Sequence, residues 1–118
     1  MMENHGVVGV FVGEEGEMIR CSIAVRAEQS REELEEQVQR EHQNANISLR
    51  RMYAFSCKGN VVDVETGLRK ICTLVYGQYT RCNGWESYEV NDCDTFCTFI
   101  REVLIFSGNT PCVLRDDT

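Results

Sequence analysis

The chain has 118 residues, of which 42% are hydrophobic and 26% are charged, a balance typical of one globular domain rather than of a disordered chain. No apolar run approaches the ~20 residues that a membrane span requires, so we expect no membrane partner. The net charge of -7 repels a phosphate backbone unless basic residues cluster, which disfavours nucleic-acid binding. The N-terminus has no basic segment followed by a cleavable apolar stretch, so we expect an intracellular protein of the cytoplasm or nucleus.

The first two predicted elements are strands. Residues 6–12 form a β-rich apolar run, and Gly13 and Gly16 follow as turn residues. Between Met18 and Val25, apolar and polar side chains alternate. Two such strands joined by a short glycine-containing loop predict a β-hairpin.

A mostly polar helix is predicted next. Ser30 and Glu33 form the S-x-x-E pattern of a capping box, which opens a helix through about Gln43. Leu34 and Val38 supply its narrow apolar edge. We therefore expect this helix to lie outside the sheet and to touch it along one line.

A third strand and an amphipathic helix follow. Residues 47–57 alternate in polarity, which predicts a strand with one face formed by Ile47, Leu49, Arg51, Tyr53 and Phe55. Apolar residues then recur at three- and four-residue steps, which predicts a helix with the stripe Val61, Val64, Leu68, Ile71 and Val75. Glu65 lies on the border of this stripe.

The last part of the chain predicts a short strand at Trp85–Val90 and a final helix. Asn91 or Asp92 caps this helix, and its apolar residues are Phe96, Phe99, Ile100, Val103 and Leu104. A brief edge strand at residues 112–114 closes the chain. The order ββαβαβα predicts a single α+β domain over residues 1–118, with a mostly antiparallel sheet and helices packed on it.

The seven cysteines are numerous for this length, and their odd number leaves at least one thiol free in any disulfide scheme. No C-x-x-C pair occurs, so the strongest zinc and redox signatures are missing. Cys93 and Cys97 have the spacing of one helical turn and could bind zinc together with Cys82. The alternative is that the cysteines are buried, reduced thiols that act as small hydrophobic side chains.

Several short motifs occur in an informative order, although each of them is weak alone. They are Gly9–Phe11 on the first strand, Cys21–Val25 on the second, Arg31 seven residues beyond Ala24, Gln43–Asn46 before the third strand, Val64–Ile71 around Glu65, and Gly84–Val90. Together they resemble the GIY-YIG nuclease superfamily, especially its branch from phages and large DNA viruses, over roughly residues 6–104.

This resemblance implies a particular site. Glu65 would hold one divalent ion, Mg2+, which polarises the scissile phosphate, and Arg31 would stabilise the charge that develops on that phosphate. Phe11 and Ser22 stand where the family has its two motif tyrosines. The resemblance also implies that Arg31 and Glu65, from two separate helices, converge over the same face of the sheet.

The chain departs from the family pattern at these same positions. Phe11 has no hydroxyl and cannot transfer a proton, Ser22 is too short to span the distance of a tyrosine, and Ala24 replaces the motif glycine. Carboxylates that oppose a phosphate surround Arg31, namely Glu28, Glu32, Glu33, Glu35 and Glu36.

Purely structural roles compete with the catalytic ones. Arg31 has the spacing to pair with Glu35, and Glu65 has the spacing to pair with Arg69 along one helix. We therefore expect a catalytically degenerate, GIY-YIG-like domain of viral or phage type that binds a protein partner and needs no cofactor. The alternatives are an active Mg2+-dependent DNA endonuclease and a cysteine-rich cytosolic adaptor or zinc-binding module.

Overall fold

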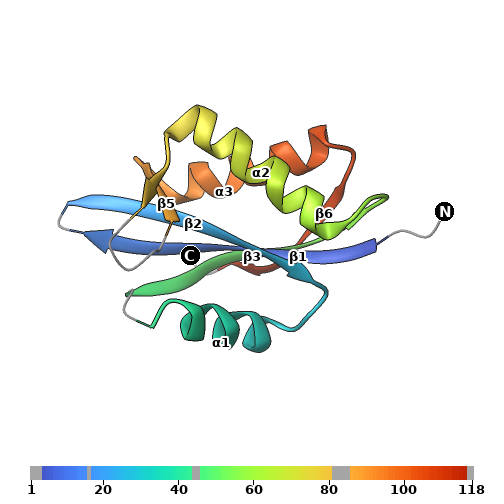
Figure 1. The fold of residues 1–118 in the computed structure, drawn as a ribbon, viewed down its shortest axis with the longest axis horizontal. Helices are drawn as coiled ribbons and strands as arrows, with labels where there is room; N and C mark the ends of the chain where they lie inside the picture. Colours follow the sequence, from blue (N-terminus) through green and yellow to red (C-terminus); the bar gives the residue numbers. More distant parts are fainter. Residues whose placement is uncertain (1–3, 16, 44–45, 81–85, 117–118) are drawn as a thin grey trace.

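The computed structural model describes residues 4–15, 17–43, 46–80 and 86–116 and confirms the expected α+β architecture (Figure 1). The elements in chain order are β1 (Asn4–Glu15), β2 (Met18–Ala27), α1 (Arg31–Glu41), β3 (Ile47–Cys57), α2 (Val61–Tyr76), β4 (Tyr79–Thr80), β5 (Glu86–Val90), α3 (Cys93–Phe106) and β6 (Thr110–Asp116). The strands form one sheet in the order β4-β5-β2-β1-β3-β6, and all neighbouring strands are antiparallel. Within the described part of the chain, no helix has the length and apolar character needed to span a membrane.

The helices lie on opposite faces of this sheet, with α1 on one face and α2 and α3 on the other (Figure 1). The central strand β1 is apolar on both faces for this reason. Val7 and Phe11 belong to the hydrophobic cluster under α1, whereas Val8 and Val10 belong to the larger cluster under α2 and α3. The continuous apolar run at residues 6–12 is the sequence signature of a strand that is covered on both sides.

The prediction that Ile47, Leu49, Arg51, Tyr53 and Phe55 share one face of β3 is wrong, because the strand contains a bulge at Arg50. Val10 of β1 pairs with Arg51, and the next residue, Phe11, pairs with Leu49, so the register shifts by one residue at Arg50. One extra residue moves the following side chains to the opposite face. Ile47 and Leu49 therefore lie under α1, whereas Tyr53, Phe55 and Cys57 lie under α2 and α3.

The helix boundaries follow local signals that the sequence carries. The Ser30 side chain accepts from the Glu33 backbone, and the Glu33 side chain accepts from the Ser30 backbone, so the predicted capping box is present. Leu34 and Val38 are the buried residues of α1, as predicted. Asp92 caps α3 by accepting from two backbone N–H groups.

The apolar stripe of α2 differs from the prediction in its last turns. Leu68 and Cys72 are buried, whereas Val75 is 58% exposed. Tyr76 packs edge-on against Phe96, with ring centroids 5.3 Å apart. The buried line thus runs through residues 68, 72 and 76 in steps of four, which places Val75 and its neighbour Leu74 on the solvent side.

Candidate functional site at the open edge of β2

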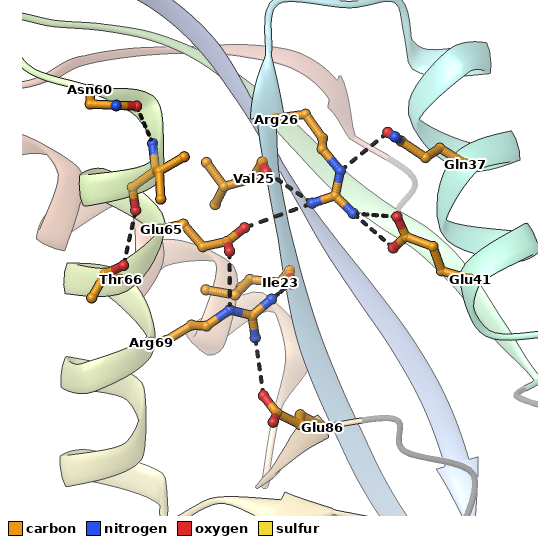
Figure 2. Close-up of polar contacts among 11 residues, drawn as sticks. Ile23, Val25, Arg26, Gln37, Glu41, Asn60, Glu65, Thr66, Arg69 and Glu86 are labelled. Atoms are coloured by element: carbon orange, nitrogen blue, oxygen red, sulfur yellow. Dashed lines mark hydrogen bonds and ion pairs between the residues drawn. The ribbon is translucent and has the colours of Figure 1, made fainter.

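The outer edge of β2 is only partly covered by its neighbour. Among the residues that the structure describes, β5 pairs with β2 over Ile19–Cys21. Further along, Arg69 of α2 donates from Nη2 to the carbonyl of Ile23 at 3.0 Å, and Arg26 donates from Nη1 to the carbonyl of Val25 at 2.9 Å (Figure 2). Guanidinium groups thus occupy two carbonyls that another strand would otherwise use.

Arg26 joins the two faces of the molecule around this edge. Its Nε donates to Gln37 Oε1 at 3.1 Å, and its Nη2 donates to both carboxylate oxygens of Glu41, at 2.9 and 2.7 Å. Its Nη1 lies 3.7 Å from Glu65 Oε2 on α2. Because α1 and α2 lie on opposite faces, this one side chain connects both helices to the sheet (Figure 2).

Arg69 extends the line of charges along β2. Its Nε lies 3.8 Å from Glu65 Oε1, and its Nη1 lies 3.8 Å from Glu86 Oε2 on β5. Alternating charges thus follow the edge in the order Glu41, Arg26, Glu65, Arg69 and Glu86, and these five side chains are called the edge network below. Each carboxylate oxygen of Glu65 faces a different guanidinium (Figure 2).

Two hollows flank Arg26. A cavity of about 110 Å³ is lined by Phe11, Ser22 and Ala24 together with residues of the edge network. A more open hollow of about 700 Å³ lies toward the far end of β2 and is lined by Val25, Val61 and Glu65 among others. Phe11 and Ser22 meet because they are direct cross-strand partners in the β-hairpin.

The predicted site residues are only partly brought together. Phe11 and Ser22 share the smaller cavity, and Glu65 lines the larger hollow on the other side of Arg26. Arg31 lines neither hollow and pairs with Glu35, with Nε 2.6 Å from Oε1. Since Arg31 and Glu65 lie on helices that cover opposite faces, the expectation that they converge over one face is wrong (Figure 1). Both local pairs that competed with catalysis, Arg31–Glu35 and Glu65–Arg69, are present.

The surroundings of Glu65 do not suit Mg2+, which requires several oxygen ligands in octahedral geometry. Both carboxylate oxygens face guanidinium groups whose positive charge opposes a cation. Among the described residues, no group of three or more His, Cys, Asp or Glu side chains is arranged to hold a metal ion. Cys82 of the expected zinc site, Gly84 and Trp85 of the last motif, and residues 44–45 of the turn lie outside the described residues.

The described cysteines are free thiols, and Cys21, Cys57, Cys72 and Cys97 are buried, as one of the two interpretations predicts. Burial raises the pKa of Cys72 to about 12, which keeps its thiol protonated at neutral pH. Cys93 is half-buried, and the Sγ of Cys21 lies 3.5 Å from the Sγ of Cys93. The association of Cys21 with the predicted pair Cys93 and Cys97 is a tertiary contact that the spacing of the cysteines does not reveal.

Sequence reasoning also missed Arg26. Its signal is a second cation near the end of the strand, flanked by Val25 and Ala27. Comparison of the chain with protein-family models, with curated proteins and with solved structures finds no match.

Proposed function

We propose that this chain is a GIY-YIG-like domain of viral or phage type that has lost catalysis and acts by binding another protein. The observation that carries the proposal is the position of Glu65 between Arg26 and Arg69. The element order supports the likeness, because a hairpin, a helix, a strand and a helix with Glu65 follow one another as the motifs imply. The separation of Arg31 from Glu65 on opposite faces of the sheet counts against the catalytic site of that family.

The edge network argues against a metal-dependent nuclease. Each charge pair at 3.7–3.8 Å is partly exposed to solvent and contributes roughly 0.2–0.5 kcal/mol. A cation at Glu65 would have to replace both pairs. Arg26 cannot move away without also losing its contacts to Gln37, Glu41 and the Val25 carbonyl. Phe11, in turn, brings no proton-transferring group to the adjacent cavity.

The outward face of α2 is the surface best suited to a protein partner. Leu74 is 85% exposed and Val75 is 58% exposed. Leu74 borders a hollow of about 590 Å³ that Lys70, Thr73 and Tyr88 also line. Exposed apolar side chains beside a hollow are typical of docking surfaces. The nearby β2 edge is covered by guanidinium groups, so we expect side-chain docking on α2 rather than addition of a strand.

A nicking assay tests the loss of catalysis. The purified chain is incubated with supercoiled plasmid and Mg2+ or Mn2+, and its melting temperature is measured with each metal and with EDTA. We expect no nicking and no metal-dependent change in melting temperature. Metal-dependent nicking that disappears in Glu65→Gln would establish the endonuclease instead.

Site-specific crosslinking tests the docking surface. A photo-crosslinking amino acid is placed at Leu74 or, as a control, at Glu32, which is exposed on α1 at the opposite face. We expect a discrete crosslinked protein from Leu74 and not from Glu32. With that protein purified, Leu74→Asp should weaken binding at least tenfold, and Glu32→Lys should leave it unchanged. Equal binding by Leu74→Asp and the wild-type chain would refute the docking surface.

A further inference from the structure

Three thiols meet where β2 passes the start of α3. Cys21 on β2 and Cys97 on α3 are both 0% exposed, whereas Cys93, the first residue of α3, is half-buried. The Cys21 thiol donates to Cys93 Sγ at 3.5 Å. Cys93 is therefore the member of this thiol cluster that a small solute can reach, and a second sulfur lies directly behind it.

The surroundings of Cys93 favour its thiolate. Hydrogen bonds from Cys21 and from Cys97, together with the positive charge of Arg50, hold the pKa of Cys93 below its ordinary value of 9.0. Burial and the Asp92 carboxylate act in the opposite direction and are outweighed. The position at the N-terminus of α3 adds the favourable end of the helix dipole.

We propose that Cys93 is an oxidation site for peroxides and that Cys21 resolves the oxidised form as a disulfide. The inference does not rest on the proposed function, because neither the edge network nor Leu74 contributes to it. Cys21 is the resolving thiol because it lies on another element at a defined contact distance, while Cys97 is on the same helix as Cys93.

The chemistry is balanced in two steps. The Cys93 thiolate attacks one oxygen of hydrogen peroxide, an S–O bond forms, the O–O bond breaks, and the departing hydroxide takes up a proton to become water. The sulfur of Cys21 then attacks the sulfenic sulfur of Cys93. The S–O bond breaks, the hydroxide leaves with the proton of Cys21 as a second water, and the S–S bond forms. Two thiols lose two electrons, and one peroxide gains them.

The two sulfurs are already close to each other. A disulfide has an S–S length of about 2.05 Å, so the sulfurs of Cys21 and Cys93 must approach by about 1.5 Å from 3.5 Å. The bond would join residues 72 positions apart and tie β2 to α3. Closing so long a loop restricts the unfolded chain, and we expect the melting temperature to rise by about 10 °C.

Peptide mapping tests the inference on the wild-type chain. The reduced protein is treated with one equivalent of hydrogen peroxide, its remaining thiols are blocked with N-ethylmaleimide, and its peptides are analysed without reduction. We expect a Cys21–Cys93 crosslinked peptide as the main product. Cys112, which is exposed on β6, should remain a reduced thiol and be found blocked by N-ethylmaleimide. Cys112→Ser should give the same product at an unchanged rate.

Trapping with dimedone tests the order of the steps. In Cys21→Ser, Cys93 should accumulate as a sulfenic acid that dimedone labels, and in Cys93→Ser the chain should consume peroxide at least tenfold more slowly. Alkylation of wild-type Cys93 by iodoacetamide should rise less between pH 7 and pH 9 than that of a free cysteine, as expected for a thiol whose pKa is lowered. Oxidation of Cys112 before Cys93, or a disulfide from Cys93 to any cysteine other than Cys21, would overturn the inference.

Discussion

Replacement of Arg26 by Met tests whether the edge network holds the two faces of the domain together. The Arg26 side chain as a whole is 23% exposed, and Arg26→Met keeps its apolar part and removes the guanidinium. The variant loses the bidentate bond to Glu41, the bond to the Val25 carbonyl, the bond to Gln37 and the longer ion pair with Glu65.

The size of the effect follows from these contacts. The Glu41 and Val25 contacts contribute about 1 kcal/mol each, because charge-assisted bonds are weakened by partial exposure. The Gln37 bond and the 3.7 Å ion pair together add about 0.5 kcal/mol. We therefore expect the free energy of unfolding to fall by about 2.5 kcal/mol and the melting temperature by about 10 °C.

Urea unfolding measures this loss, and Arg31→Met is the matched control. Arg31 pairs with Glu35 within one helix, where such a pair contributes about 0.3–0.5 kcal/mol. High salt should reduce the effect of Arg26→Met only in part, since the bond to the Val25 carbonyl does not depend on a carboxylate. Equal losses of stability in the two variants would show that the edge network does not connect the helices.

Four further substitutions test the packing and the helix caps. Gly67→Ala should raise the free energy of unfolding by about 0.5–1 kcal/mol, because Gly67 is inside α2 and an added Cβ meets no atom within 4 Å. Gly6→Ala should lower the free energy of unfolding by about 1–3 kcal/mol, since its Cβ would lie 2.6 Å from the Phe55 ring. A loss of stability in both variants would refute this reasoning. Leu34→Ala should lower the free energy of unfolding by about 3 kcal/mol, because Leu34 is 0% exposed between α1 and the sheet, and an effect below about 1 kcal/mol in urea unfolding would contradict this packing. Hydrogen bonds from the Thr95 side chain and the Asp94 backbone lower the pKa of Asp92 below 3.8 in the folded chain, so its carboxylate stabilises the fold above that pH and the contribution is lost as the pH falls through the folded pKa. Asp92→Asn should therefore be less stable than the wild-type chain at pH 7, and a difference in urea midpoints that stays constant down to pH 2.5 would refute the assignment.

The elements of the fold could be predicted because their signals are local. The capping box of Ser30 and Glu33, the cap at Asp92 and the narrow apolar edge of α1 each depend on residues within a few positions of one another. The same holds for the pairs Arg31–Glu35 and Glu65–Arg69, which need only one turn of helix. The meeting of Phe11 and Ser22 follows from the hairpin, whose short loop sets the register.

The placement of the helices on the sheet could not be predicted in this way. An apolar run such as residues 6–12 shows that both faces of β1 are covered, but it does not say which helix covers which face. A single bulged residue, Arg50, then exchanges the two faces along β3, and nothing in the alternation of the sequence marks it. Arg31 and Glu65 are separated because α1 and α2 cover opposite faces of the sheet.

The sequence by itself therefore determined the type and order of most strands and helices, which residues cap the helices α1 and α3, and which ion pairs form within a helix. Only the tertiary structure decided that Arg26 contacts both Glu41 and Glu65 and that Cys21 contacts Cys93, a residue 72 positions away. The physical reason is the distance along the chain over which each kind of interaction acts. Capping and periodicity act over a few residues of one segment, whereas these contacts depend on how the sheet, its bulge and its two layers of helices pack together.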